Sequence, residues 1–188
     1  MSTDADTAAS TVTVPIPAGA TLTVDGRHLV AKGRAGEVRR DFPRDVLTIT
    51  VRPGEVQIAL TIPPHRKQAK ALLHTWERHV GNLLTGATKG FEARLKSVAA
   101  HFPMKLQVRE DHLLIENFLG EKHPRVADIV AGVSATVEGD YVILRGVDIE
   151  LVGRAAATIE RTTHIRDYDP RVFQDGIYLV DHAHPREG

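Results

Sequence analysis

The chain has 188 residues, and its 24 lysines and arginines balance its 24 aspartates and glutamates, so the formal net charge is zero. It has no cysteine, which excludes disulfides and thiolate metal sites and favours a reducing compartment. No apolar run approaches the ~20 residues of a membrane span and the polar N-terminus does not resemble a secretory signal, so we expect a soluble, cytoplasmic protein.

The first half of the chain is predicted to form a small antiparallel sheet covered by one helix. Residues 1–10 are small and polar, and we expect them to be disordered. Short β-rich runs follow as far as residue 62, and an Asp-Gly pair at 25–26 is a hairpin signal between two of them. After two prolines, apolar residues recur at helical spacing over 69–87, which predicts a helix that packs on the sheet.

The predicted start of this helix carries three cations. Arg66, Lys67 and Lys70 lie where the helix dipole is positive, and each is unfavourable there by about 0.3–1 kcal/mol. Either a bound anion offsets this cost or the side chains are simply solvated. The sequence leaves both alternatives open.

The second half repeats this plan. Apolar residues alternate from Lys89, which predicts a strand that ends the first unit near residue 100. Further strand-like runs occupy 104–108, 112–116, 134–138 and 141–146. Asp148 is suited to cap a following helix, and a final strand over 176–180 closes the unit.

The two halves also match residue by residue. Residues 24–37 align with 108–121 at an offset of 84, with five identities in fourteen positions. We therefore predict an α+β fold of two tandem similar domains, each a small, mostly antiparallel β-sheet with one packed α-helix. The predicted repeats cover residues 11–100 and 101–181, and a polar tail covers 182–188.

A loop in the second repeat presents cations. Residues 116–125 (ENFLGEKHPR) follow a short apolar strand and contain several turn residues, so we expect an exposed loop. It carries Lys122, His123 and Arg125, and we expect Phe118 to offer a flat apolar face beside them. Such a loop suits a phosphate-rich partner.

A second loop, residues 166–180 (RDYDPRVFQDGIYLV), interleaves cations with aromatic residues. The pattern favours phosphate contact by Arg166 and Arg171. Phe173 and Tyr178 fit either base stacking or the core.

Other chemistries find little support. The ten histidines show no metal-ligand spacing, and no nucleophile elbow or phosphate-binding loop is present. Residues 33–36 (GRAG) match the GxxG of KH modules, but predicted strands flank them where KH modules have helices, so a turn is favoured. We expect no catalytic residue, no metal and no cofactor.

Several of these stretches resemble the large-subunit ribosomal protein L six family (L nine in eukaryotes) in its archaeal form. They are HFPM (101–104), ENFLGEKHPR (116–125), GVDIELVGRAAATIE (146–160) and DPRVFQDGIYLV (169–180). TGATKGFEARLKSVAAHFP (85–103) looks like the end of the family's first domain. The resemblance covers roughly residues 11–180.

The resemblance implies a structural, non-enzymatic component of the large ribosomal subunit that assists subunit assembly and translation. It implies binding of large-subunit rRNA, chiefly through the second domain, near the sarcin-ricin region where translational GTPases dock. Neighbouring large-subunit proteins are further implied partners. The expected rRNA-binding residues, from the loops and motifs together, are Lys122, His123, Arg125, Arg154, Arg166, Arg171, Phe173, Gln174, Asp175, Tyr178, Lys89, Arg94 and Lys96.

The neutral charge departs from this family, whose members are mostly basic. Fewer phosphate contacts give a shallower salt dependence, so RNA shape and 2′-hydroxyls are expected to carry more of the recognition. Two rival hypotheses remain. One is a protein-interaction adaptor whose repeated sheets pair with other chains, and the other is a small enzyme that uses His or Asp.

Overall fold

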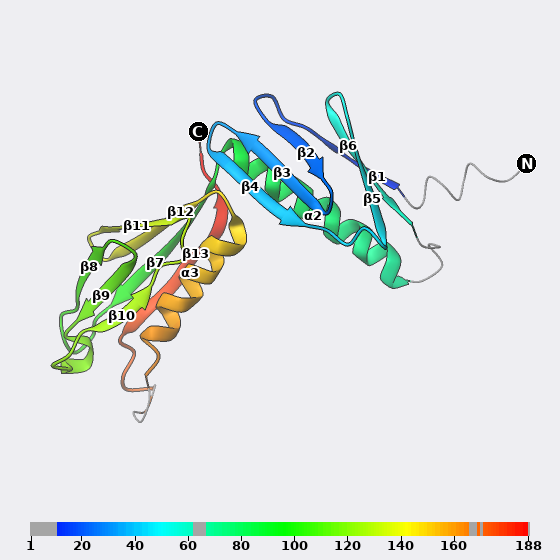
Figure 1. The fold of residues 1–188 in the computed structure, drawn as a ribbon. Coiled ribbons are helices and arrows are strands. Elements are labelled where there is room, and N and C mark those ends of the chain that lie inside the picture. Colours follow the sequence, from blue (N-terminus) through cyan, green and yellow to red (C-terminus); the bar gives the residue numbers. More distant parts are fainter. Residues whose placement is uncertain (1–10, 62–66, 166–168, 170, 188) are drawn as a thin grey trace, which may run out of the picture. The chain divides into compact units, whose positions relative to one another are not determined.

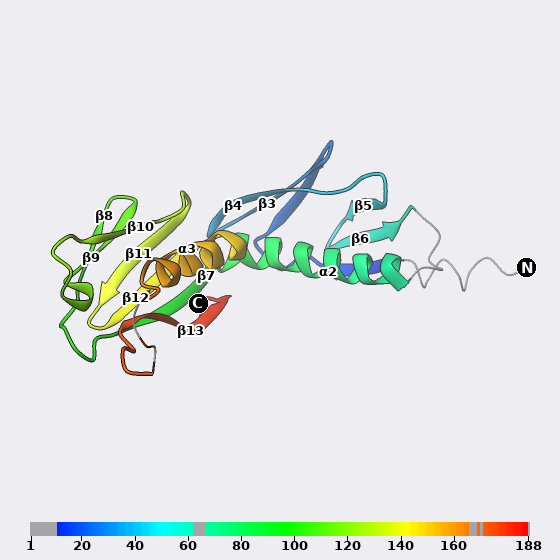
Figure 2. The same ribbon diagram turned by 90° about the horizontal axis from the view of Figure 1, so that it is seen from below.

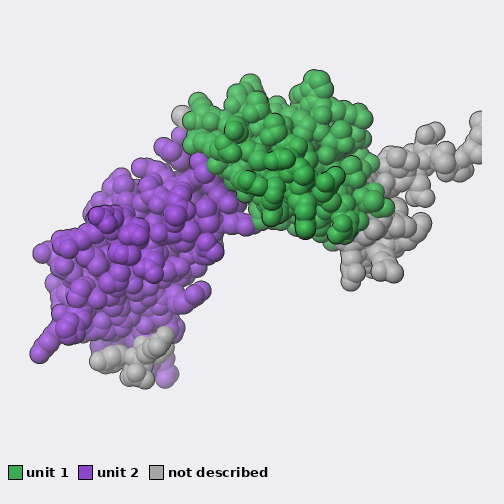
Figure 3. Space-filling view, viewed as in Figure 1, with its two compact units in different colours: residues 1–89 green, residues 90–188 purple. Residues whose placement is uncertain are grey.

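The computed structural model describes residues 11–61, 67–165, 169 and 171–187 (Figure 1). The chain divides into two compact units, Met1–Lys89 and Gly90–Gly188, which we call unit 1 and unit 2 (Figure 3). Each combines small antiparallel sheets with one long helix, which confirms the predicted α+β class. None of the helices in the described residues has the length and apolarity that crossing a membrane requires.

Unit 1 places two three-stranded antiparallel sheets against one helix. One sheet has the order β2-β3-β4, from β2 (Thr21–Asp25), β3 (His28–Gly33) and β4 (Gly36–Asp41). The other has the order β1-β6-β5, from β1 (Thr11–Pro15), β5 (Leu47–Arg52) and β6 (Glu55–Leu60). Helix α2 (Lys67–Thr88) contacts strands of both sheets, because its apolar stripe buries Trp76, Val80 and Leu84. The possible anion site at its start depends partly on Arg66, which lies outside the described residues.

The hairpin between β3 and β4 closes the C-terminal end of α2. In its turn, the Ala35 backbone N–H donates to the Ala87 carbonyl at 2.8 Å, and Arg34 Nε donates to the Thr88 carbonyl at 2.9 Å. Carbonyls in the last turn of a helix have no partner within the helix, so the hairpin satisfies them. The GxxG segment is therefore a strand-to-strand turn that caps a helix, and it is not a KH-type loop between two helices.

Gly33 has no room for a side chain, because a Cβ atom there would lie 2.5 Å from the Ala87 carbonyl oxygen. We expect Gly33→Ala to lower the free energy of unfolding by about 1–2 kcal/mol, since the turn must move off the helix end. Gly81→Ala within α2 is the matched control, because its Cβ would meet no atom within 4 Å. The control should raise the free energy of unfolding by about 0.4–1 kcal/mol. Urea unfolding measures both, and equal stability of the two variants would contradict the close contact.

Unit 2 repeats the plan of unit 1 with one additional strand. Its three-stranded sheet has the order β10-β9-β8, from β8 (Lys105–Arg109), β9 (His112–Glu116) and β10 (Arg125–Asp128). Its four-stranded sheet has the order β11-β12-β7-β13, from β7 (Phe91–Val98), β11 (Val133–Glu138), β12 (Tyr141–Gly146) and β13 (Gly176–Pro185). Strands β7 to β12 and helix α3 (Ile149–Thr162) take the places of β1 to β6 and α2. The duplication seen in the sequence is thus a duplication of the fold.

Two boundaries differ from the sequence prediction. Strand β7 pairs with β12 and β13, both in unit 2, so it opens the second unit where we expected it to end the first. The alternating pattern of residues 91–98 predicts a strand but not its pairing partners, and the partners decide the unit. Strand β13 also continues to Pro185, so most of the predicted polar tail is strand.

One hydrophobic core fills unit 2 between its two sheets and α3. Figures 1 and 2 show α3 running along the four-stranded sheet that contains β7 and β13. The buried face of α3 includes Val152, Ala156 and Ile159. Asp148 caps the helix as predicted, because its carboxylate accepts a hydrogen bond from the Glu150 N–H at 2.8 Å. This core supports the loops that follow β7, β9 and α3.

Candidate nucleic-acid interface

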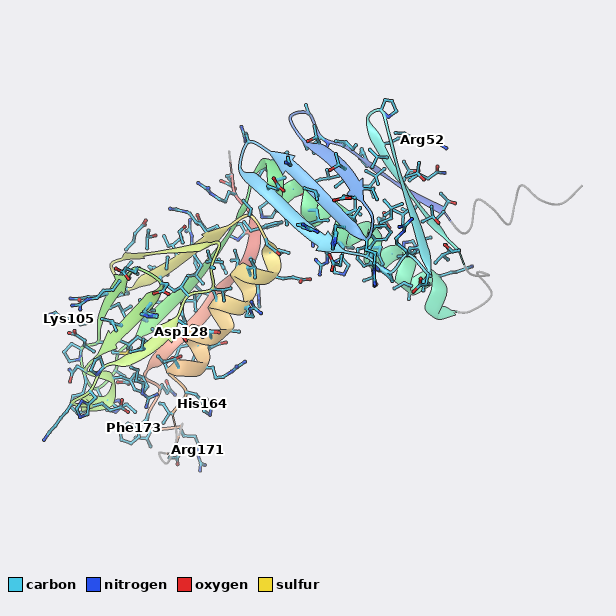
Figure 4. All side chains as sticks on the ribbon, viewed as in Figure 1. Arg52, Lys105, Asp128, His164, Arg171 and Phe173 are labelled. Atoms are coloured by element: carbon cyan, nitrogen blue, oxygen red, sulfur yellow. The ribbon has the colours of Figure 1, made fainter. Side chains whose placement is uncertain are left out.

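Three loops of unit 2 are joined by direct contacts, and we call them together the loop end. They are residues 99–104, residues 117–124 and the described residues of 163–175. The Asn117 side-chain amide donates to the Pro103 carbonyl at 3.0 Å, which joins the first loop to the second. The rings of His101 and Phe173 pack with centroids 4.8 Å apart and an interplanar angle of 32°, which joins the first loop to the third. Figure 4 shows His164, Arg171 and Phe173 gathered at this end of the unit.

Arg125 joins the second loop to the end of α3. Its guanidinium donates to both carboxylate oxygens of Glu121, at 2.9 and 2.6 Å. It also donates to the carbonyls of Thr162 and His164, at 2.8 and 3.3 Å, and it lies 4.2 Å from the centre of the Phe118 ring. The hydrogen bonds from Arg125 lower the pKa of the Glu121 carboxyl, and burial opposes them only in part. The structure therefore gives Arg125 a positioning role, and any phosphate contact would have to compete with these bonds.

The prediction that Phe118 offers an exposed apolar face is wrong, because its side chain is fully buried. Asn117 and Leu119 have left-handed backbone conformations, with φ of 59° and 48°, and a short 3₁₀ turn over Phe118–Gly120 directs the ring into the core. Lys122 and His123 are exposed as predicted. Within the described residues, neither side chain has a hydrogen bond or an ion pair.

Asp175 is among the expected rRNA-binding residues, but the structure gives it a different role. Its side chain is 0% exposed, so it cannot reach an RNA directly. It accepts hydrogen bonds from the Ala100 N–H at 3.1 Å, the His101 N–H at 3.2 Å and the His101 ring Nδ1 at 3.0 Å. Burial acts to raise the pKa of Asp175, but the hydrogen bonds from His101 and Ala100 outweigh it and leave the pKa below its usual value. Asp175 thus holds the first and third loops together.

A cleft of about 560 Å³ opens between the end of α3 and the third loop, and we call it the α3 cleft. Its lining residues are Ala157, Glu160, Arg161, Thr163, His164, Ile165, Phe173, Gln174 and Tyr178. The predicted residues Phe173, Gln174 and Tyr178 therefore share one site. The helix residues of the cleft were not among the expected rRNA-binding residues. The helical period shows that Arg161 lies off the buried face, but it does not show which loop Arg161 is next to.

The other predicted residues lie away from the cleft or make separate contacts. Arg94 and Lys96 are exposed on β7, where Arg94 Nε donates to Glu92 at 2.9 Å and Lys96 Nζ lies 5.9 Å from the centre of the Tyr141 ring. Lys89 and Arg154 are exposed at the end of unit 1 and on α3. Arg171 is 89% exposed beside Asp169 in the third loop, at 3.2 Å. Arg166 lies outside the described residues.

The described residues of the loop end do not form a metal-binding site. There, no group of three or more His, Asp or Glu side chains could hold a metal ion. Its described side chains instead combine exposed cations, ring systems and an amide, the groups that proteins use on nucleic acids.

Comparison with known proteins agrees with this composition. The family model described as Ribosomal protein L6 matches residues 102–176, from the first loop of the loop end to the start of β13. The large ribosomal subunit protein uL6 of Methanobrevibacter smithii is 41% identical over 167 residues, which cover 89% of this chain and 93% of that protein. The uL6 proteins of Methanospirillum hungatei and Archaeoglobus fulgidus are each 43% identical, covering 90% and 89% of this chain and 96% and 87% of their own lengths. These matches confirm the resemblance found in the sequence motifs, and the chain belongs to the uL6 family of large-subunit ribosomal proteins.

Proposed function

We propose that the protein is a structural constituent of the large ribosomal subunit that binds large-subunit rRNA through the loop end. One observation carries the proposal. Hydrogen bonds of the Arg125 and Asp175 side chains hold the three loops together on a packed core, while Lys122 and Arg171 of the same loops are exposed to solvent. A rigid set of exposed cations lowers the entropy that binding must overcome.

The loop end and the adjoining end of α3 carry both cations and acids, but not all of the described cations are paired. Within the described residues, the exposed cations of the loop end are Lys122 and Arg171, and the exposed Arg161 lies beside it at the end of α3. The described acids of the loop end have partners within unit 2, because Glu121 is bound by Arg125, Asp169 lies beside Arg171, and Asp175 is buried against His101. Lys122 and Arg161, which have no ion pair among the described residues, therefore remain to contact a phosphate backbone although the whole chain has no net charge.

The family resemblance supports finer parts of the proposal. It supports a contact near the sarcin-ricin region, where translational GTPases dock, and a role in subunit assembly and translation. Neighbouring large-subunit proteins would be further partners. In this role the protein acts by binding and positioning, without catalysis.

Charge reversal on the second loop tests the proposal. We expect the double variant Lys122→Glu, His123→Glu to be released from large subunits at lower salt than the wild type, because it loses the Lys122 cation and the His123 ring and adds two repulsive charges. The salt dependence of binding should flatten by about 0.7–0.9 in log-log slope for each phosphate that is no longer neutralised. Stability should change by less than about 0.5 kcal/mol, because both side chains are exposed and lack partners among the described residues.

The measurement is sedimentation of cell lysates on sucrose gradients at increasing salt, with the protein detected in each fraction. Arg27→Glu, Arg52→Glu is the matched control, because it reverses two exposed cations at hairpins of unit 1. Unchanged retention of the Lys122, His123 variant would contradict the assignment of the second loop. Wild-type protein that stays at the top of the gradient would contradict the ribosomal proposal and favour the adaptor hypothesis.

A further inference from the structure

The α3 cleft has the size and composition of a site for one small planar group. Its volume of about 560 Å³ lies within the ~300–1,000 Å³ range of ligand sites. Its walls are mostly apolar, with Ala157 and Ile165 beside two aromatic rings and a few polar side chains. Sites with this balance bind small molecules and orient them by a small number of hydrogen bonds, and the two aromatic rings give this cleft surfaces on which a flat group can stack.

Both aromatic rings of the cleft are held in place by contacts within unit 2. Phe173 packs on the His101 ring, which the buried Asp175 carboxylate fixes through Nδ1 at 3.0 Å. The Tyr178 hydroxyl donates to the Gln174 carbonyl at 3.1 Å, and its ring covers Gly176 so closely that a Cβ atom there would lie 3.0 Å from it. Fixed rings present stacking surfaces with little entropy cost.

Most polar side chains of the cleft are available for a ligand, whereas the buried Thr163 hydroxyl donates to the Glu160 carbonyl at 3.1 Å and accepts from the Ile177 N–H at 3.0 Å. Within the described residues, the side chains of Arg161, His164 and Gln174 have no hydrogen-bond or ion-pair partner. Glu160 uses one carboxylate oxygen, Oε1, to accept from the Leu179 N–H at 3.3 Å and keeps the other. The Gln174 amide can both donate to and accept from the edge of a base, and Arg161 can bind a phosphate.

From this arrangement we propose that the α3 cleft binds one unstacked nucleotide of the rRNA, a proposal that rests on the function proposed above. The base enters the cleft, stacks on an aromatic ring and bonds its edge to Gln174, as in single-stranded RNA recognition. The phosphate stays at the rim near Arg161, because the Glu160 carboxylate repels it from the interior. The binding of the base then adds a salt-independent contribution to the salt-dependent one of Lys122 and His123.

Filling the cleft without changing charge tests this proposal. Ala157 is an exposed alanine of α3 that lines the cleft, and Ala71 is an exposed alanine of α2 in unit 1. We expect Ala157→Phe to weaken binding to purified large-subunit rRNA about 10-fold, the order of one stacking interaction, with an unchanged salt slope. Ala71→Phe should bind like the wild type. Gln174→Ala is a second variant with a smaller loss, about 3- to 10-fold, and it removes a side chain without adding bulk.

The outcomes separate this proposal from the proposed function. Absence of rRNA binding by the wild type would refute both. Wild-type binding together with unchanged binding by Ala157→Phe and Gln174→Ala would refute the nucleotide site alone. If Ala157→Phe keeps full affinity for naked rRNA but loses retention on large subunits, the cleft is occupied by a protein side chain and the proposal is wrong. Thermal unfolding of each variant confirms that the measured protein is folded.

Discussion

Asp175→Ala is expected to lower the free energy of unfolding of unit 2 by about 3 kcal/mol, because it removes a buried ionised acceptor and leaves its backbone donors unpaired. The substitution removes the acceptor of three hydrogen bonds and leaves the N–H groups of Ala100 and His101 without their partner. Asp175→Asn should lose about 2 kcal/mol, because one carbonyl oxygen remains while the new amide N–H group faces other donors.

Acid titration of stability tests the same carboxyl group. The folded-state pKa of Asp175 lies below its usual value, so its ionised form stabilises unit 2 above about pH 4, the unfolded pKa, and this contribution is lost as pH falls through the folded pKa. The difference in stability between wild type and Asp175→Asn should therefore shrink on acidification from pH 7 to pH 2. Urea unfolding followed by peptide-resolved amide hydrogen exchange measures it, with unit 1 peptides as the internal reference. A difference that stays constant over this range would contradict the assigned role of the carboxylate.

The duplication was visible in the sequence because the matched residues occupy equivalent structural positions. Leu29 and Leu113 are both fully buried in the middle strand of a three-stranded sheet. His28 and His112 begin those strands, and each contacts the aspartate that ends a neighbouring strand, Asp41 in β4 and Asp128 in β10. Residues that share a role at the same place in two copies of a fold keep a recognisable spacing.

The candidate site could be predicted only where exposure follows from local sequence. Lys122 and His123 are exposed because charged residues next to Pro124 at a turn are seldom buried. The direction of Phe118 depends on two left-handed backbone conformations at Asn117 and Leu119, which residue composition does not determine. The α3 cleft is lined by the end of α3 and by residues 173–178, and the pattern of either segment alone does not show that their side chains face one cavity.

Arg125 illustrates the same limit most clearly. As a cation following a polar loop it resembles a phosphate ligand, and only the structure shows that its acceptors include carbonyls 37 and 39 positions later in the chain. Reversing this charge is therefore expected to disturb the fold of the loop as well as any contact with RNA. The 25% exposure of the Arg125 side chain and its bonds to Glu121 indicate a stabilising contact.

We expect Arg125→Ala to lower the free energy of unfolding of unit 2 by about 2–3 kcal/mol. It removes bidentate hydrogen bonds to Glu121, leaves the Thr162 carbonyl without this donor, and takes a cation from the face of Phe118. Arg125→Lys should recover less than half of this loss, because one ammonium group cannot reproduce the planar fork. Lys122→Ala is the matched control in the same loop, and it should be nearly neutral because Lys122 is exposed and lacks a partner within the described residues.

Hydrogen exchange and rRNA binding together decide whether Arg125 positions the loop or contacts phosphate. As a positioning residue, its loss should speed amide exchange in residues 117–124 and at the end of α3, and weaken rRNA binding because Lys122 and His123 are no longer held in one geometry. As a direct phosphate ligand with no structural role, its loss would leave exchange unchanged and would only flatten the salt dependence of binding. The bonds to Glu121, Thr162 and His164 favour the first result, and unchanged exchange would refute it.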